Sequence, residues 1–384
     1  MYTIMKGRRR QIRPKHPKGK MSHSPHTNPR LIPTLRDDIT HGGFFANMKR
    51  EAREIEEFYL NDEEREQLSK KGRLWRWFVL AWWVLKNSFF KLTSTRRILL
   101  LIGLLLMVTE VSVQDDSGQA MIHYRTLGIL FLLLVLILEL KDKLLAHSEL
   151  EAGRAVQSAM TPEPTPFVPG WNVWLFTRSA NEVGGDLVDF HRFDGNRFGV
   201  AIGDVAGKGL GAALFMVKIQ STLRALAPDF ESLSDLASKL NAILIRDGVP
   251  GKFASLIFVR LGPAVGDLWF VNAGHMPPLI VSPDGVTEFP KGDAALGLSV
   301  DAQFTARDVK LSTGQSFVLY SDGLTEAQNE AGEFYGLERL KTLCRQNSSV
   351  SAQSFGERIL AAISAFEKDA RRNDDLSLVI LQRN

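Results

Sequence analysis

The sequence is nearly free of cysteine, because Cys344 is the only one in 384 residues. No disulfide can therefore form within the chain, and no cysteine-based metal site is available. This composition suits a reducing compartment. No short apolar core with a small-residue cleavage site opens the chain, as a secretory signal would. Cys344 also lies in a helical pattern with no anion-binding loop attached, which argues against a cysteine nucleophile.

Acidic residues are missing from the first 36 positions, which carry ten basic ones. Because the whole chain carries a net charge of only +4, the remaining residues sum to −6, and the isoelectric point near 9.1 describes the tail rather than the folded part. Such a tail can contact acidic lipid, but its proline, histidine and serine content favours a solvated segment. We expect no nucleic-acid partner. A charge-dense helix is predicted over 46–72, so that 1–72 form a cytoplasmic tail.

Long apolar runs are confined to residues 73–142. Residues 74–90 hold four of the seven tryptophans beside two basic residues, which is typical of a helix at a membrane–water boundary. A membrane-spanning helix needs roughly 20 apolar residues, and 98–113 and 120–140 approach that length. They are predicted to form a transmembrane helical hairpin, with a buried soluble hairpin as the alternative.

Basic residues flank both outer ends of this hairpin, with Arg96 and Arg97 before it and Lys141 and Lys143 after it. Positive flanks place both ends in the cytoplasm. Residues 143–165 then form a predicted helical linker with a weak apolar stripe. The stripe is too short for a stable coiled coil, but it offers a surface for a homodimer.

The remaining residues, 166–384, are long enough for a substantial soluble core. Strand patterns alternate with turn signals, and short connections favour antiparallel sheets, so the fold class is α+β. Strands are predicted at 171–177, 186–193, 197–204, 254–261, 268–274, 277–282, 316–322 and 376–381, and helices at 210–226, 231–245, 336–346 and 351–369.

Two aspartates are predicted to face each other across a hairpin. If residues 194–196 form its loop, Phe193 faces Arg197 and paired residue numbers sum to 390. Asp186 then lies opposite Asp204, where Cβ atoms are about 4.5–5.5 Å apart. A two-residue loop would shift this pairing by one. Like charges at this spacing are destabilising unless a cation lies between them.

Further aspartates stand at the ends of apolar strands. Asp322 follows one such strand, and Asp374 and Asp375 directly precede another. One aspartate at a strand end is usually a turn residue, but this set favours an oxygen-ligand site for Mg²⁺ or Mn²⁺. Two such ions can clamp a phosphoryl group and activate water. The segment GDVAGKG does not fit a P-loop, which would need glycine at 202 and serine or threonine at 209.

Six segments resemble the PPM-type metal-dependent protein phosphatases, most closely the SpoIIE/RsbU-like bacterial serine phosphatases. The order and spacing agree over about 170–384. The segments are EVGGDLVDF (182–190), IGDVAGKGLGAAL (202–214), FASLIFV (253–259), VNAGHMPPLI (271–280), VLYSDGLTEAQN (318–329) and NDDLSLVIL (373–381). The resemblance implies an αββα sandwich of two antiparallel sheets flanked by helices, here preceded by the transmembrane hairpin.

The resemblance also implies two Mn²⁺ or Mg²⁺ ions and the residues that hold them. Asp204 would bridge both ions, with the Val205 carbonyl as a further ligand, and Asp186 would hold one side, in part through water. Asp204 and Asp186 would thus carry the catalysis, in which a metal-activated water attacks phosphorus directly. Asp322 and Asp374 would hold one metal. Asp374 is preferred to its neighbour because the first acid of the pair matches the family's ligand position.

The implied substrate is a phosphoserine or phosphothreonine on a regulatory protein, either an anti-sigma-factor antagonist or another STAS-type protein. The implied location is the bacterial cytoplasmic membrane, with the catalytic domain in the cytoplasm. The alternative is a non-catalytic, membrane-tethered regulator that binds a phosphoprotein.

Three further residues are weaker candidates for substrate binding. Lys208 lies in the glycine-rich turn beside the predicted metals, although its stem can simply pack there. His275 could orient substrate or water, but a turn histidine is the favoured interpretation. Arg178 could contact phosphate, but a surface ion pair is favoured.

Overall fold

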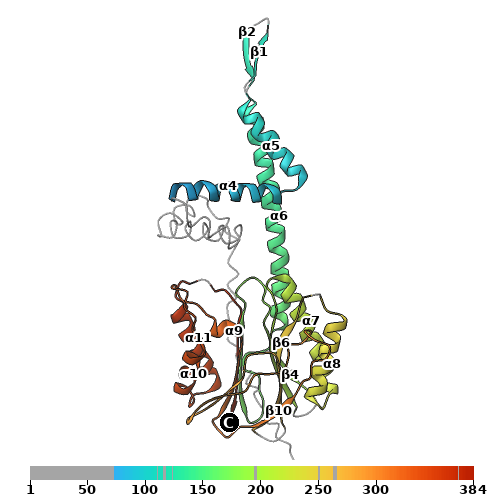
Figure 1. Cartoon of the computed structure of the whole chain (residues 1–384), viewed down its shortest axis with the longest axis vertical. Coiled ribbons are helices and arrows are strands. Elements are labelled where there is room, and N and C mark those ends of the chain that lie inside the picture. Colours follow the sequence, from blue (N-terminus) through green and yellow to red (C-terminus); the bar gives the residue numbers. More distant parts are fainter. Residues whose placement is uncertain are drawn as a thin grey trace, which may run out of the picture. The chain divides into compact units, whose positions relative to one another are not determined.

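The computed structural model describes residues 73–109, 111–115, 118–122, 124–193, 197–249, 251–262, 266–370 and 372–384 (Figure 1). Contacts divide the chain into two units, residues 1–138 and residues 139–384, and each is described by itself. The basic tail and the charged helix predicted within 1–72 lie outside the described residues.

The first unit contains helices and one small β-hairpin. The order is α4 (Arg73–Lys91), α5 (Ser94–Val108), β1 (Val111–Asp115), β2 (Gly118–Ile122) and the start of α6 (Arg125–Met160). Helix α4 corresponds to the predicted interfacial helix 74–90. Helix α6 is continuous and runs on into the second unit, in line with the helix expected to lead out of the hairpin.

The predicted membrane spans 98–113 and 120–140 differ from the structure at the end of the first span and at the start of the second. Helix α5 ends at Val108, and β1 and β2 pair as antiparallel strands with Val111 opposite Ile122. The sequence VSVQD alternates β-branched with polar residues, which favours a strand over a helix. Helix α5 therefore ends five residues before its predicted end and α6 begins five residues after its predicted start, and a strand hairpin joins them.

Helices α5 and α6 approach each other closely at a pair of glycines. Gly103 and Gly128 are buried, and a Cβ on Gly128 would lie only 2.7 Å from the Gly103 carbonyl oxygen. Small residues that let two helices touch backbone to backbone are frequent in membrane helix pairs. Large apolar side chains on the other faces are exposed: Ile98, Leu101, Leu105, Val108, Leu130, Leu133 and Leu136.

By length and composition alone, one helix in the described part of the chain could cross a bilayer, and it is Leu210–Asp229. Nearly half of that stretch is buried, because it is a core helix of the second unit. Helix α5 has 15 residues, fewer than the roughly 20 that a full span requires.

The second unit is built from two antiparallel sheets of five strands each, in the orders β10-β7-β6-β5-β4 and β3-β12-β11-β8-β9. The strands are β3 (Trp171–Arg178), β4 (Leu187–Arg192), β5 (Phe198–Val205), β6 (Ala254–Leu261), β7 (Asp267–Ala273), β8 (Leu279–Ser282), β9 (Gly285–Glu288), β10 (Ala306–Lys310), β11 (Ser316–Tyr320) and β12 (Leu376–Arg383). The helices are α7 (Leu210–Leu226), the 3₁₀ helix η1 (Ala227–Asp229), α8 (Leu233–Arg246), α9 (Asp322–Thr325), α10 (Leu337–Gln346) and α11 (Ala352–Glu367).

Three apolar layers hold this unit together. Side chains of both sheets interdigitate in the middle, as Ile202 and Ile257 from one sheet meet Val379 and Leu381 from the other. Helices α7 and α8 cover the outer face of the first sheet, and α10 and α11 cover that of the second (Figure 1). Both faces of each sheet are therefore buried, and the predicted αββα sandwich is confirmed.

Each predicted strand and helix of this unit is present. The structure adds β9 and β10, which the sequence analysis missed, because GVTE and ARDVK are short, mostly polar edge strands without clear alternation. It also adds α9, a single helical turn, where the analysis expected the end of a strand.

Candidate metal centre

The hairpin of β4 and β5 has the predicted register. Leu187 pairs with Gly203 and Val188 pairs with Ile202, so that paired numbers sum to 390. The Phe193 amide donates to the Arg197 carbonyl at 2.9 Å, as expected if residues 194–196, which lie outside the described part, form the loop. The ladder ends at Leu187 and Gly203, so Asp186 directly precedes β4 and Asp204 directly follows the last residue of β5 that pairs with β4.

The backbone around Asp186 lies against Asp204 and its neighbour. A Cβ on Gly185 would lie 3.2 Å from the Val205 carbonyl oxygen and 3.5 Å from Asp204 Oδ1. Asp204 is the penultimate residue of β5 and pairs with Ser255 on β6. The loop before β4, the Asp204 carboxylate and the Val205 carbonyl therefore meet at one end of the first sheet.

The second sheet contributes Asp322 and Asp374 from neighbouring strands. Asp322 opens α9 just after β11, and Asp374 lies two residues before β12. The amide of Ser321 donates to the Ser377 carbonyl at 3.0 Å, which joins the two strand ends. The backbone of Gly323 lies so close to the Asp375 carbonyl that a Cβ there would clash. Only glycine lets these two acidic segments approach so closely.

Asp375 has a different task from Asp374. Its carboxylate accepts hydrogen bonds from the amides of Ala180 at 2.7 Å and Gly185 at 2.6 Å, and it lies 3.4 Å from the amide of Asp186. It is buried, whereas the Asp374 side chain is 40% exposed. Asp375 therefore fixes the loop that carries Asp186. The sequence analysis missed this role, because two adjacent acids give no signal of which one turns inward.

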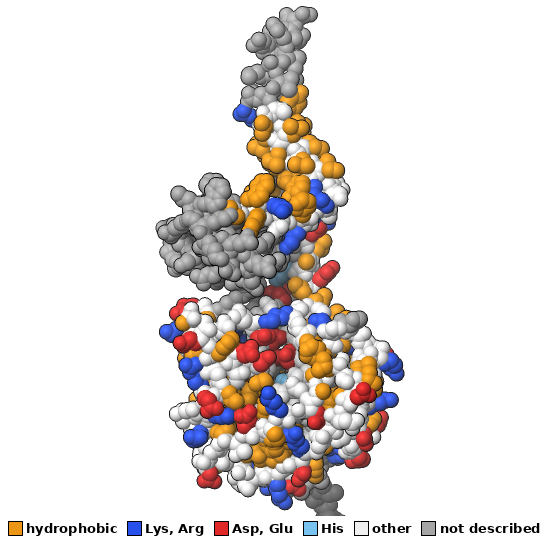
Figure 2. Space-filling view, viewed as in Figure 1, with side chains coloured by type: hydrophobic (Ala, Val, Ile, Leu, Met, Phe, Trp, Pro, Cys, Tyr) orange, Lys and Arg blue, Asp and Glu red, His pale blue; other side chains and the backbone are white. Residues whose placement is uncertain are grey.

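The carboxylates interact strongly with one another. Burial raises the pKa of Asp204 to about 7, with further increases from the charges of Asp322, Asp374 and Asp375. Burial also raises the pKa of Asp186 well above its usual range, and the nearby Asp204 charge adds to this. The pKa of Asp322 is raised by burial and by Asp374. Acidic side chains gather in a patch on one face of this unit (Figure 2). The site is short of positive charge.

The donor atoms suit hard divalent cations. All are carboxylate or main-chain oxygens, and the buried Asp186 Oδ2 has no hydrogen-bond partner, so it is available to a ligand. Within the described residues, no three acidic, histidine or cysteine side chains converge as a ready-made chelate. Mg²⁺ and Mn²⁺ tolerate this because they keep several water ligands. The set therefore fits such ions with water completing their shells.

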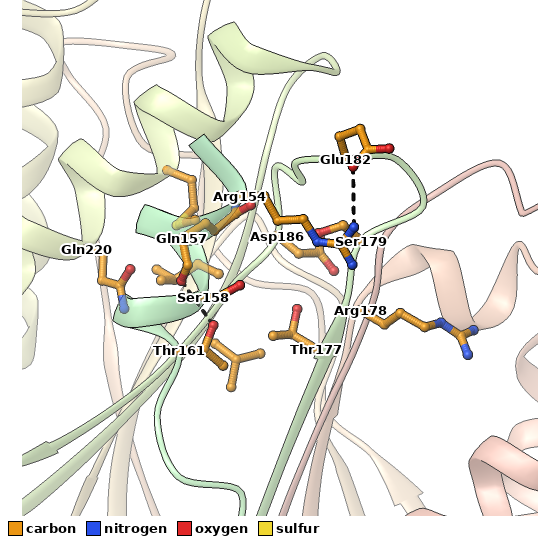
Figure 3. A pocket seen from close by; sticks show the side chains of 13 residues that line it. Arg154, Gln157, Ser158, Thr161, Thr177, Arg178, Ser179, Glu182, Asp186 and Gln220 are labelled. Carbon is orange, nitrogen blue, oxygen red and sulfur yellow. Dashed lines mark hydrogen bonds and ion pairs between the residues drawn. The ribbon is translucent and has the colours of Figure 1, made fainter. Parts of the chain in front are cut away.

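A cavity of about 400 Å³ opens beside Asp186 (Figure 3). The end of α6 forms one wall, where Arg154 pairs with Glu182 at 3.3 Å and the Gln157 amide group bonds both the amide and the carbonyl of Gly184. Arg178 lines the same cavity. The loop that leads to Asp186 is thus held directly by the linker helix.

Two of the weaker candidates have clear surroundings. Arg178 lies 3.9 Å from Glu367, as the ion-pair interpretation expected, and it still faces the cavity. His275 is buried, its Nδ1 lies 2.7 Å from Ser255 Oγ, and burial lowers its pKa to about 4. Asn272 bonds both the amide and the carbonyl of His275. The ring of His275 is thus enclosed by the fold and contacts Ser255, and its role in substrate binding stays a prediction.

A buried polar network that the sequence did not reveal anchors the end of α6. Arg224 on α7 donates to both carboxylate oxygens of Asp189 at 3.0 and 2.7 Å, and also to the Met160 carbonyl. His191 Nε2 lies 2.9 Å from Asp189. Burial alone would raise the pKa of Asp189, but hydrogen bonds from His191 and Arg224 hold it below its usual value. Strand β4 is therefore tied to the last residue of the linker helix.

Comparisons with known proteins agree with this geometry. Residues 194–384 match the family model described as Stage II sporulation protein E (SpoIIE). The chain is similar to Protein IcfG of Synechocystis sp., with 27% identity over 264 residues, 62% of this chain and 42% of that protein. It is also similar to phosphoserine phosphatase RsbU of Bacillus subtilis, with 27% identity over 239 residues, 62% of this chain and 70% of that protein.

Among solved structures, the SiaA-PP2C domain of Pseudomonas aeruginosa has the same fold, with a TM-score of 0.55 and 17% identity over 63% of this chain and 99% of that domain. The chain spans less than half the length of IcfG, at 42%. The family match over residues 194–384 and the sandwich fold together make the C-terminal part of the chain similar to SpoIIE/PP2C-type phosphatase domains.

Proposed function

We propose that this chain is a metal-dependent protein serine/threonine phosphatase of bacterial signalling, attached to the cytoplasmic membrane with its phosphatase domain in the cytoplasm. One observation carries the proposal. Asp186, Asp204, Asp322 and Asp374 come from separate strand ends of one domain, where burial and the charges of Asp322 and Asp374 raise the pKa of Asp204 to about 7. Such a cluster needs cations to be stable in its ionised form.

The proposed ligands divide between two ions. Asp204 would be shared by both ions with the Val205 carbonyl as a further ligand, Asp322 and Asp374 would hold one ion, and Asp186 would hold the other. Bound Mn²⁺ or Mg²⁺ would neutralise phosphoryl charge and bring the pKa of a coordinated water near neutrality. Overall, the elements of water add across the serine O–P bond, which yields a free hydroxyl and inorganic phosphate.

The remaining residues of the site would hold the substrate and the loop. Lys208 and Arg178 are the proposed phosphate contacts, because Lys208 pairs with Asp374 and Arg178 lines the cavity beside Asp186. Asp375 would keep Asp186 in place through its hydrogen bonds to the amides of Ala180 and Gly185. None of these three roles requires the residue to react.

The proposed substrate is a phosphoserine on a small regulatory protein, an anti-sigma-factor antagonist or another STAS-type protein. Two similar proteins, RsbU and RsbP of Bacillus subtilis, are named phosphoserine phosphatases. Their names support the phosphoserine specificity, and the partner class rests on the family resemblance.

Membrane attachment is supported by the surface of the first unit. Apolar side chains on the outer faces of α5 and α6 are exposed, with Leu105 and Leu136 each at 63%, and a soluble surface rarely leaves such a patch open. We propose that lipid covers it, with α4 at the interface. Farther along α6, Leu145 and Val156 are also exposed and would form the homodimer contact of the linker.

The test uses the full chain in detergent with Mn²⁺, a phosphoserine peptide and a nucleoside monophosphate. Release of phosphate from the peptide in preference to the nucleotide supports a protein phosphatase. Preference for the nucleotide would instead indicate a small-molecule phosphatase. A chain that binds Mn²⁺ and the phosphopeptide without turnover would support the non-catalytic regulator.

A further inference from the structure

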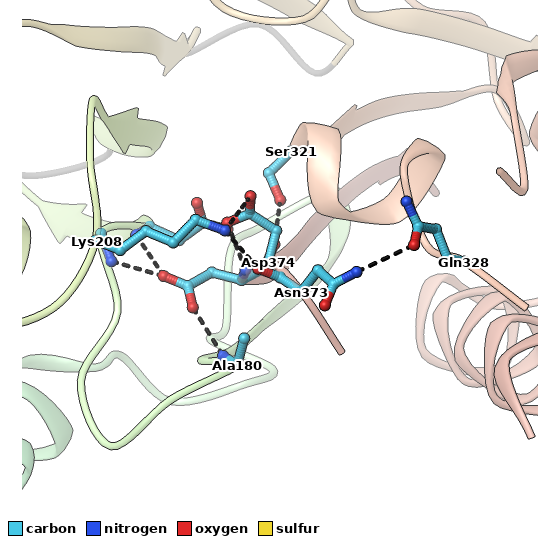
Figure 4. Close-up of polar contacts among 9 residues, drawn as sticks. Ala180, Lys208, Ser321, Gln328, Asn373 and Asp374 are labelled. Carbon is cyan, nitrogen blue, oxygen red and sulfur yellow. Dashed lines mark hydrogen bonds and ion pairs between the residues drawn. The ribbon is translucent and has the colours of Figure 1, made fainter. Parts of the chain in front are cut away.

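Lys208 extends across the opening of the carboxylate cluster. It lies in the loop between β5 and α7, yet its Nζ donates to Asp374 Oδ2 at 3.1 Å and to the Asn373 carbonyl (Figure 4). The two segments are 166 positions apart in the sequence. The Lys208 side chain is 58% exposed, so it can leave this position without disturbing the core.

This contact is specific to one member of the cluster. Within the described residues, Lys208 is the basic side chain that forms an ion pair with the cluster, and Asp186, Asp204 and Asp322 have no such partner. Nearby Lys252 is directed elsewhere, because its Nζ donates to the Ala206 carbonyl at 2.9 Å. The positive charge of Lys208 therefore acts directly on the Asp374 carboxylate.

We propose that Lys208 is a built-in counter-cation that occupies Asp374 when no metal is bound and must release it before an ion can bind there. Lys208 thereby sets the Mn²⁺ or Mg²⁺ concentration at which the site fills. The proposal rests on the proposed function only in taking Asp374 as a metal ligand. An ammonium and a divalent cation cannot share one carboxylate oxygen closely, since both are positive and each needs the same lone pairs.

Two effects make the competition measurable. An exposed ion pair favours the paired state of Lys208 and Asp374 over the unpaired state by up to about fivefold. A metal that displaces the lysine must overcome this factor. The released ammonium stays on the same loop, where its repulsion of the bound ion weakens binding further. Removing the lysine charge should therefore tighten Mn²⁺ binding by about tenfold.

The experiment compares Lys208→Met with Lys218→Met in the full chain in detergent. Lys218 lies on α7 and donates to the Asp247 carbonyl, so its substitution removes the same charge without touching the cluster. Mn²⁺ affinity is measured by titration calorimetry, and the Mn²⁺-induced rise in Tm is measured separately. Lys208→Met should bind Mn²⁺ about tenfold tighter and show the larger rise in Tm, whereas Lys218→Met should match the parent.

Further variants and outcomes separate the two proposals. Lys208→Arg keeps the charge and should keep an affinity close to that of the parent. If the parent hydrolyses phosphopeptide but Lys208→Met binds Mn²⁺ no tighter, the counter-cation proposal alone fails. The counter-cation proposal alone also fails if Lys208→Met and Lys218→Met gain Mn²⁺ affinity equally, because the change in net charge would then explain the gain. If the parent binds no Mn²⁺, both proposals fail. If it binds Mn²⁺ without hydrolysis, the affinity comparison still decides the role of Lys208.

Discussion

Replacing Asp204 with asparagine should stabilise the metal-free protein while it abolishes turnover. The pKa of Asp204 is raised from an ordinary value of 3.8 to about 7 by burial and by the charges of Asp322, Asp374 and Asp375. In the unfolded chain this group ionises near pH 4, whereas in the folded chain it holds its proton until about pH 7. It therefore destabilises the folded state progressively as pH rises from about 4 to about 7, and by a constant amount above that.

The magnitude follows from the size of the shift. About three pKa units at 1.36 kcal/mol each give roughly 4 kcal/mol as an upper limit. Asp204 is partly exposed, and solvent screening reduces this to about 1–3 kcal/mol. For a domain of this size, about 2 kcal/mol corresponds to a rise in Tm of ~5 °C. The gain should be full at pH 8 and nearly vanish at pH 4, where the parent carboxyl is protonated in the folded chain and about half protonated in the unfolded chain.

The assay pairs metal-free melting curves at pH 4 and pH 8 with Mn²⁺-dependent hydrolysis of a phosphoserine peptide. Asp204→Asn should melt higher at pH 8, equal the parent at pH 4 and show activity near background, because asparagine cannot bridge two ions. Parental turnover would refute the two-metal assignment. A variant that unfolds without metal at both pH values would make Asp204 a structural residue.

Three further predictions concern the linker, the membrane and the adjacent acids. Ala152→Pro should change the kcat of the full chain in membranes without replacing a proposed metal ligand, because it breaks α6 just before Arg154 and Gln157, which hold the loop to Asp186. Ala152→Ser is the control, and equal turnover of the proline variant and the parent would reject the coupling. The full chain should sediment with membranes at high speed, while a fragment from residue 166 stays in the supernatant; full-length protein that remains soluble without detergent would contradict membrane attachment. Asp375→Asn should lower the metal-free Tm by roughly 5 °C, because a buried acceptor of backbone amides loses its charge, whereas Asp374→Asn should leave that Tm nearly unchanged and weaken Mn²⁺ binding. Equal melting of the two variants would show that the pair is not divided in this way.

The sequence predicted those parts of the fold that depend on local patterns. The β4–β5 register followed from a three-residue loop between the two strands, and the pairing of Leu187 with Gly203 confirms it. The helices of the second unit followed from helical patterns at 210–226, 231–245, 336–346 and 351–369.

The features that the sequence did not reveal depend on contacts between distant segments. The bond from Lys208 to Asp374 joins positions 166 residues apart, and nothing near either residue in sequence indicates the other. Likewise, no pattern distinguishes the inward-facing Asp375 from its neighbour. The β1–β2 hairpin was missed because it interrupts two apolar runs whose composition matched membrane helices better than strands.

The position of β12 between β3 and β11 has a consequence for assembly. This strand closes the second sheet, and the acids just before it complete a site whose first member, Asp186, lies almost 190 positions earlier. The β4–β5 hairpin with Asp186 and Asp204 therefore lacks Asp322 and Asp374, and the proposed site stays incomplete without them. During synthesis, the nascent chain would remain inert toward phosphoproteins until β12 had emerged and docked. The slow, long-range step of folding thus also switches on the chemistry.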